Sequence, residues 1–209
     1  MELKAFYEPV RAQYINVPKP MVERVARDVV RQFAEDTFTY IVKDKFTSLP
    51  ANQATFFVSP PQSHMVIRIA SVTVDGTPLE PASPAQMDSR VRQWRTQVGK
   101  PSYFWHDQED EVRVVPMADQ HFYSNVEVVM AVKPKRDAVD IDDLFVDQYY
   151  ETLLAGILGH FYSQSDKPWS DPNKANMQLG FYLRGVEQAK IRRAQDHTSR
   201  HRTVKYGGL

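Results

Sequence analysis

Acidic side chains are the residues of this sequence best placed to do chemistry. One stretch holds five aspartates: Asp137, Asp140, Asp142, Asp143 and Asp147. Their carboxylates are potential cation ligands, but the spacing lacks the alternating oxygen ligands and the bend-forming glycine of a calcium loop. Negative charge is also favourable at the N-terminal end of a helix dipole. We therefore favour helix capping for this cluster and expect no metal site in the chain.

A second carboxylate group, Glu109, Asp110 and Glu111, lies between two expected strands. Glycoside hydrolysis uses two carboxyl groups held across a cleft at a defined separation. Three consecutive charged residues are more simply explained as a solvated turn. We favour the turn and keep hydrolysis as an alternative.

The histidines offer a weaker metal pattern. His197 and His201 are four residues apart and would share a helical face, but only Asp196 is a nearby further donor. We favour solvated histidines among the arginines of the C-terminal segment. His160 falls in an apolar helix, where we expect a core or interface histidine.

Several kinds of chemistry are excluded by residues that the sequence lacks. There is no cysteine, which excludes thiol catalysis, disulfides and cysteine-bound zinc. The eight glycines form no dinucleotide fingerprint, no phosphate-binding loop and no nucleophile elbow. We therefore expect a protein that is not an enzyme and has no cofactor. No secretion signal is visible at the N-terminus, and no apolar run is long enough to span a membrane.

The charge of the chain is balanced overall and divided along its length. Lysine and arginine total 26, as do aspartate and glutamate, which argues against a generic nucleic-acid binder. Residues 184–209 nevertheless carry a net charge of about +5, and residues 1–183 about −5. A basic C-terminal segment on an acidic body favours a partner surface there, either another protein or nucleic acid, with a merely solvated terminus as the simpler alternative.

Hydrophobic periodicity predicts an α+β protein. We expect an extended arm over residues 1–17, an amphipathic helix over 20–35 and two long helices over 142–163 and 172–195. The β-rich region between them contains a short helix over 84–96 and a hairpin turn at Asp75-Gly76. The expected strands are 37–42, 55–58, 65–74 and a three-strand meander formed by 102–106, 111–115 and 123–132. The predicted domains are a helical bundle of residues 1–36 and 133–196, an antiparallel β-rich insertion over 37–132, and a flexible, extended C-terminal arm over 197–209.

The helix over 142–163 is apolar on two sides. Tyr150, Leu154 and Leu158 form the second apolar side, which is buried either within the fold or between subunits. Gly156 and Gly159 permit close approach of a neighbouring backbone. Among the tryptophans, Trp94 and Trp105 fall in periodic elements and are expected in the core, whereas Trp169 lies in a loop and is the better candidate for a contact residue.

The combined order of these features resembles a known family. The motifs are Val91-Arg92-Gln93-Trp94 with Gly99-Lys100-Pro101-Ser102-Tyr103, the strand end at Val115-Pro116, the strand 126–132 before an acidic helix start, the helix that begins Tyr149-Tyr150-Glu151, and the turn that begins Trp169-Ser170-Asp171-Pro172. In this order they resemble the head-to-tail adaptor proteins of tailed bacteriophages, also called connector or tail tubular proteins. The resemblance covers nearly the whole chain and is clearest over residues 90–193.

The resemblance implies a structural role in the virion neck, after assembly in the host cytoplasm. Such proteins form a ring, usually of twelve subunits, that joins the portal to a tail or nozzle protein and lets DNA pass without specific binding. It implies no catalytic residues and no membrane partner. The implied portal-binding arm contains Lys190, Arg192, Arg193, Arg200, Arg202, Lys205, Tyr206 and Leu209, and the implied subunit interface contains Tyr150, Leu154, Leu158 and Trp169. The alternatives are a nucleic-acid-binding protein that uses the basic C-terminal segment and a virion-associated cell-wall hydrolase.

Overall fold

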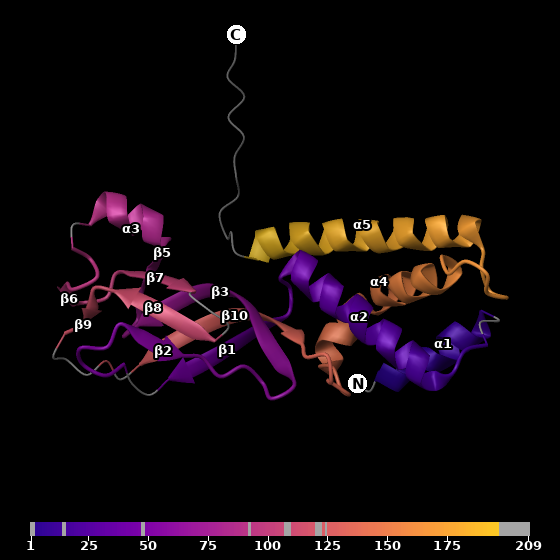
Figure 1. Cartoon of the computed structure of the whole chain (residues 1–209), viewed down its shortest axis with the longest axis horizontal. Coiled ribbons are helices and arrows are strands. Elements are labelled where there is room, and N and C mark those ends of the chain that lie inside the picture. The colour runs from indigo at the N-terminus through magenta and orange to yellow at the C-terminus, as the bar shows by residue number, and fades with distance from the viewer. Residues whose placement is uncertain are drawn as a thin grey trace, which may run out of the picture.

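The computed structural model shows an elongated α+β molecule, with the long helices gathered at one end and the strands, together with one short helix, at the other (Figure 1). It describes residues 3–13, 16–46, 49–91, 93–106, 110–119, 123 and 125–196. The helices are η1 (Leu3–Phe6, a 3-10 helix), α1 (Tyr7–Ala12), α2 (Lys19–Thr37), α3 (Pro84–Arg90), α4 (Asp143–Tyr162) and α5 (Pro172–Asp196). The strands are β1 (Ile41–Phe46), β2 (Thr55–Phe57), β3 (His64–Val74), β4 (Thr77–Pro78), β5 (Glu80–Pro81), β6 (Val98–Gly99), β7 (Tyr103–His106), β8 (Glu111–Val115), β9 (Met117–Ala118) and β10 (Val126–Pro134). The predicted α+β class is confirmed.

The prediction of an extended N-terminal arm is wrong. Residues 3–12 form η1 and α1, which pack on α2 and bury Leu3, Phe6 and Val10. Proline disfavours helix at the residue before it, but Pro9 lies in the first turn of α1. The first four N–H groups of a helix have no partner within the helix, so a proline there removes no helical hydrogen bond.

The helix α2 is longer than its periodic pattern suggested, and the strand that follows starts later. Thr37 belongs to the last turn of α2, where its hydroxyl donates a hydrogen bond to the Phe33 carbonyl (Oγ1···O 2.7 Å). Phe38 then ends the helix in the left-handed conformation (φ 52°), and β1 begins at Ile41 rather than Thr37. The apolar stripe of α2, including Val22, Val25 and Phe33, is buried as predicted.

Two four-stranded sheets make up most of the β region. One has the strand order β1-β10-β3-β4 and is antiparallel throughout, and the other has the order β2-β8-β7-β5. The strands β6 and β9 form a short parallel pair, and β5 also pairs in parallel with β7. The hairpin turn at Asp75-Gly76 is confirmed: both residues have positive φ, and Val74 pairs directly with Thr77.

The predicted three-strand meander is only partly correct. The strands β7 and β8 do form an antiparallel hairpin, but β10 joins the other sheet, between β1 and β3. A central strand has both edges hydrogen-bonded, which suits the mostly buried side chains of β10. Strands consecutive in sequence are therefore not neighbours here, because the chain crosses between sheets after Val115.

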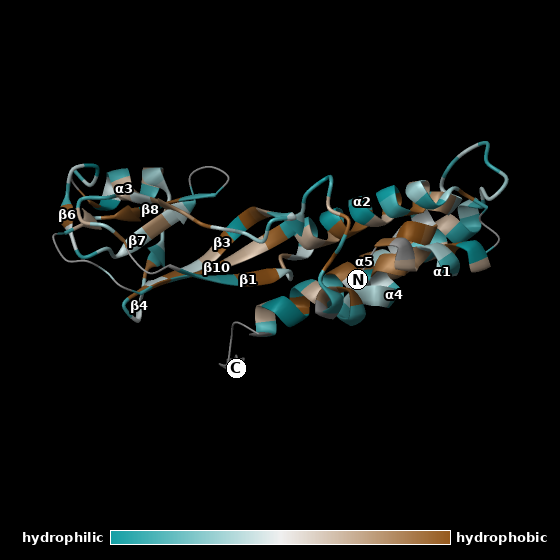
Figure 2. Cartoon of the chain, turned by 90° about the horizontal axis from the view of Figure 1, so that it is seen from below, coloured by the Kyte–Doolittle hydropathy of each residue, from teal (hydrophilic) through white to brown (hydrophobic). Residues whose placement is uncertain are grey.

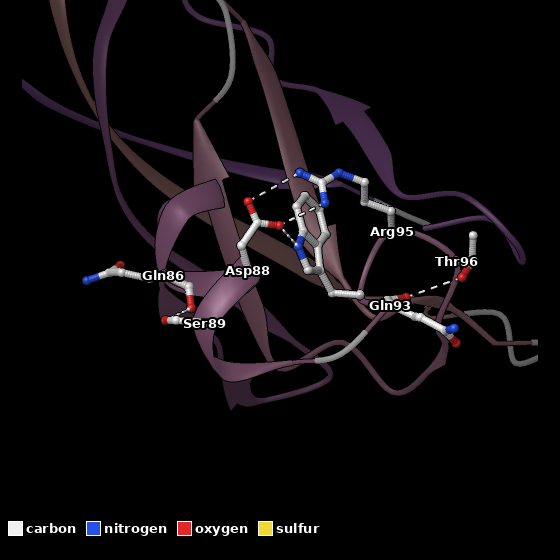
Figure 3. A network of polar contacts seen from close by, with 7 residues as sticks. Gln86, Asp88, Ser89, Gln93, Arg95 and Thr96 are labelled. Carbon is white, nitrogen blue, oxygen red and sulfur yellow. Dashed lines mark hydrogen bonds and ion pairs between the residues drawn. The ribbon is translucent and has the colours of Figure 1, made fainter.

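The short helix α3 ends earlier than predicted, at Arg90. Ser83 and Gln86 form a capping box at its start, and Val91 is already extended (φ −129°). The turn that follows returns Trp94 toward α3, where its indole N–H donates to Asp88 (Nε1···Oδ1 2.8 Å). Arg95 forms an ion pair with the same carboxylate at 2.8 Å (Figure 3). The hydrogen bonds from Arg95 and then from Trp94 lower the pKa of Asp88 below its usual value.

The hydrophobic core is one continuous cluster that extends from the helices into the first sheet. It includes Phe33 of α2, Leu153 of α4 and Val128 of β10. A smaller cluster in the β region contains Trp94 and Trp105, whose rings meet edge to face with centroids 5.1 Å apart. Both tryptophans are buried, as predicted. Figure 2, the view from below, shows hydrophobic segments both among the helices and along the strands.

The helices α2, α4 and α5 contact one another, and α2 also packs on β10. The β end is reached through two short connections, residues 38–40 and 135–142. The division into a helical domain and a β-rich domain stays a prediction.

Candidate assembly surface

Three glycines allow the helices to approach one another closely. A Cβ atom added at Gly156 of α4 would lie 2.8 Å from side-chain atoms of both Tyr182 in α5 and Val29 in α2. One added at Gly159 would lie 2.8 Å from the Leu179 side chain, and one at Gly185 would overlap Thr152. Real Cβ atoms essentially never lie this close to other atoms, so a side chain at these positions would not fit. The prediction that Gly156 and Gly159 permit close approach of a neighbouring helix is therefore confirmed.

An open groove runs between α4 and α5 beside this close contact. It has a volume of about 560 Å³, and its apolar lining includes Leu154, Ala155 and Leu158 from α4 and Phe181 from α5. Glu151 and Arg184 supply one charge of each sign. A groove of this kind is suited to an amphipathic protein segment.

The helix α5 exposes an unusual amount of apolar surface. Its side facing the protein is buried through Ala175, Val186 and Ala189, but five large apolar side chains of the helix are exposed: Met177, Leu179, Phe181, Leu183 and Ile191. Phe181 is 49% exposed, and the Arg184 guanidinium lies 4.7 Å from its ring centroid. Met177 and Phe181, four residues apart, place exposed apolar side chains next to each other, and such a surface marks a site of contact with another macromolecule.

The four residues implied as a subunit interface occupy different surroundings. Leu154 and Leu158 line the groove, although Leu158 is itself largely buried. Tyr150 is partly buried and its ring stacks on Phe6 of η1 (centroids 5.3 Å apart). Trp169 is partly buried beside the main core, and its indole N–H donates to Gln164 (Nε1···Oε1 3.3 Å).

The residues implied as a portal-binding arm are only partly within the described chain. Lys190, Arg192 and Arg193 lie in the last turns of α5, and Lys190 forms an ion pair with Glu187 at 2.9 Å. The other arm residues, like His197 and His201, lie outside the described residues: Arg200, Arg202, Lys205, Tyr206 and Leu209.

The acidic cluster is placed around the start of α4. The Asp142 carboxylate accepts a hydrogen bond from the Phe145 N–H (Oδ1···N 3.1 Å), which is the predicted capping role. Asp137, Asp140 and Asp147 are exposed. Over the parts of the chain that the structure describes, no group of three or more His, Cys, Asp or Glu side chains could hold a metal ion.

The remaining candidates for chemistry are not brought together into a centre. Glu111 lies in β8 opposite Phe57 of the edge strand β2, whereas Glu109 is outside the described residues. His160 is exposed on α4, so it is not a core histidine, and its place in an interface stays a prediction. No helix in the described part of the chain has the length and apolarity needed to cross a membrane.

A second cavity, of about 550 Å³, lies where the helices meet the first sheet. The Tyr40 ring stacks on Phe145 (centroids 4.6 Å apart) and meets the His64 ring edge on at 4.8 Å. His64 is only 5% exposed; its Nδ1 lies 3.0 Å from the Ser63 hydroxyl. Its Nε2 is buried without a hydrogen-bond partner among the described residues. We call this the joint cavity.

Burial makes His64 a pH-sensitive element of stability. Burial lowers the pKa of His64 below 6.5, and this outweighs the nearby Asp142 carboxylate, which raises it. The unfolded chain therefore protonates His64 more readily than the folded chain does. The stability that neutral His64 contributes above pH 6.5 is lost as the pH falls toward the lower pKa of the folded state. We expect His64→Gln to lose less unfolding free energy than the wild type between pH 7.5 and pH 5. Urea titrations across this range measure the difference, and parallel curves for the two proteins would contradict the prediction.

Sequence reasoning missed the exposed residues of α5 as a binding surface. Met177 and Phe181 are four residues apart and share one side of this helix, but nothing in their spacing says whether that side is buried. The available signal was that Leu179 and Leu183 fall on a different side of the helix from Met177, Phe181 and Ile191. An apolar helix without a single apolar stripe needs more than one packing partner.

A helical body with an exposed apolar groove, joined to a β region in which the described residues form no catalytic centre, defines a protein that acts through contacts with other proteins. The model of the family described as SU10 adaptor protein matches residues 10–205. The chain therefore belongs to this family of bacteriophage adaptor proteins, and the resemblance seen in the sequence is confirmed. Its role is that of a structural virion component. No curated protein matches the sequence.

Proposed function

We propose that this protein forms a ring of twelve subunits beneath the portal, where it joins the capsid vertex to the tail and lets DNA pass through the central channel. The exposed apolar surface of α5 is the observation that carries the proposal. A closed ring needs two different complementary faces on each subunit. On α5, Phe181 borders the α4–α5 groove, while Leu183 lies on another side of the helix.

In this proposal the neighbouring subunit covers the α4–α5 groove. Leu154 and Leu158 form its apolar base, and Tyr150 and Trp169 lie on the same helical end of the molecule. Burial of large aromatic and aliphatic side chains provides most of the binding free energy of protein interfaces. The ring assembles in the host cytoplasm and remains in the virion neck, with no enzymatic activity and no membrane partner.

The two ends of the subunit have different partners in the assembled neck. The basic arm (Lys190, Arg192, Arg193, Arg200, Arg202, Lys205, Tyr206 and Leu209) binds the portal protein, and the β region binds a tail or nozzle protein. Phe57 supports the second assignment, because it is exposed on the edge strand β2 at the β end. The acidic body of the chain suits a channel that must not hold DNA.

Electron microscopy of this protein mixed with its portal tests the proposal. We expect an added ring of density on the tail-facing side of the portal. Absence of ring density would overturn the proposal. Strong DNA binding that weakens with added salt would instead favour the nucleic-acid-binding alternative.

Deletion of residues 197–209 provides a test of the arm. We expect the shortened chain to keep its cooperative unfolding, because residues 3–189 of the described chain already form a continuous hydrophobic core. Portal binding should weaken at least about tenfold, since the deletion removes three basic side chains. Co-sedimentation with portal particles measures the change, and undiminished binding would disprove the arm assignment.

A further inference from the structure

One face of α2 holds the segment by which the chain leaves β10. Arg27, Arg31 and Glu35 are spaced by four residues and therefore lie along the same face of this helix. The Arg27 guanidinium donates to two main-chain carbonyls, those of Ala138 (Nε···O 2.7 Å) and Arg136 (Nη1···O 2.9 Å). A single side chain of the helical end thus fixes two points of the connection between β10 and α4.

The contacts continue in order along the helix. The Arg31 guanidinium donates to the Pro134 carbonyl, and the Glu35 carboxylate forms an ion pair with Lys133 (Oε2···Nζ 2.9 Å). The Lys133 side chain is only 14% exposed, so water screens this pair less than an ordinary surface pair. As α2 runs from residue 27 to residue 35, its partners run back from residue 138 to residue 133. We call this set of contacts between α2 and residues 133–138 the arginine clamp.

The clamped segment is a turn between the two ends of the molecule (Figure 1). Beyond Pro134 a hydrogen bond from the Ala138 N–H to the Lys135 carbonyl (3.2 Å) closes the turn. Carbonyls in a turn have no regular partner in a helix or a sheet, and here arginine side chains satisfy them. Hydrogen bonds from a charged donor are stronger than those between neutral groups. The shape of the turn therefore depends on α2.

Hollows border this connection at both of its ends. One hollow, of about 550 Å³, lies against the clamp and is lined by Arg27, Arg31 and Arg136 among other polar residues. The joint cavity is lined by Asp140, Ile141 and Asp142, and the two hollows share no lining residue. Densely packed atoms resist displacement, whereas atoms that border a hollow have room to move. The hydrogen bonds of the clamp thus hold a connection that packing alone leaves partly open.

We propose that the arginine clamp is a conformational lock on the joint between the two ends of the subunit. While the clamp is closed, it fixes the direction in which β10 meets the helices. When it opens, the β end changes its angle to the helical end, because the released bonds belong to partly exposed side chains and not to the core. The lock is a property of the single subunit and does not depend on the proposed ring.

A double variant opens the clamp. Arg27→Ala combined with Arg31→Ala removes all three hydrogen bonds to the carbonyls. The matched control combines Arg24→Ala with Arg136→Ala. It removes two arginines from the same hollow, and thus the same charge, but leaves the three hydrogen bonds in place.

Spin labels measure the angle between the two ends as a distance. Lys45→Cys in β1 and Asn176→Cys in α5 provide two exposed labelling sites, and the natural chain has no cysteine that would compete. By double electron–electron resonance we expect a narrow distance distribution in the otherwise unchanged chain and in the control. The clamp variant should show a distribution at least about twofold wider. Arg31→Ala alone, which keeps both Arg27 bonds, should give an intermediate width. Equal widths in the clamp variant and the control would overturn the proposal.

Hydrogen exchange followed by mass spectrometry separates an opened joint from a general loss of stability. We expect peptides that cover residues 133–142 to exchange at least about tenfold faster in the clamp variant, with peptides from residues 149–161 of α4 unchanged. Unchanged exchange over residues 133–142 would overturn the proposal. Exchange that rises equally in α4 would also overturn it, because the arginines would then contribute only to overall stability.

Discussion

Substitution Phe181→Asp should abolish ring assembly while leaving the subunit folded. The aromatic ring borders the α4–α5 groove and is half exposed, so the isolated subunit loses little packing when it is removed. In the assembled ring the same position would bury a carboxylate and lose an aromatic anchor. Loss of an anchor residue costs about 2 kcal/mol or more, and a buried charge adds to this. We expect affinity between subunits to fall by about 100-fold or more.

A matched control for Phe181→Asp is Val98→Asp. Val98 is 48% exposed, nearly the same as Phe181, but it lies in β6 at the opposite end of the molecule. Sedimentation velocity and negative-stain images of both variants with the portal measure the difference. A ring formed by Phe181→Asp, or equal loss of assembly in both variants, would contradict a helical subunit interface.

The second large effect is expected at Gly156, where three helices meet. A side chain there would collide with Val29 of α2 and Tyr182 of α5. Overpacking of a close helix contact costs about 1–3 kcal/mol, and a β-branched residue in a helix adds to the strain. We expect Gly156→Val to lose about 3 kcal/mol of unfolding free energy, which corresponds to a fall of about 10 °C in Tm.

The same substitutions at Gly180 provide the control for Gly156. Gly180 lies within α5, and a Cβ atom added there meets nothing within 4 Å. Alanine at this position should therefore stabilise the protein by about 0.5–1 kcal/mol, since glycine is a poor helix former. Thermal unfolding of Gly156→Ala, Gly156→Val, Gly180→Ala and Gly180→Val gives the comparison. Similar stability of the two valine variants would show that α4 does not need the glycine.

The sequence predicted best those elements whose signals are local. The Asp75-Gly76 hairpin and the capping of α4 by the aspartate cluster each depend on a few adjacent residues, and the structure has both. Sheet membership is different, because it depends on which edge of which strand is free. Nothing near Val126 indicates that β10 joins β1 and β3 rather than β8.

The binding surfaces were harder to predict than the fold. Leu154 and Leu158 could be placed on one face of α4 from spacing alone, and both line the groove. The exposure of Phe181 depends on the position of α4 beside α5, which periodicity does not give. His64 gave no signal at all, since its burial arises from Tyr40 and Phe145, which are distant in sequence.

The position of β10 has a mechanical consequence. This strand lies between β1 and β3 and leads directly, through residues 135–142, into α4. Both of its ladders are antiparallel and run lengthwise, along the long axis of the molecule (Figure 1). Tension between the two ends of the subunit therefore loads these hydrogen bonds in shear, many at once, instead of peeling them apart one by one. The subunit therefore resists stretching along its own long axis.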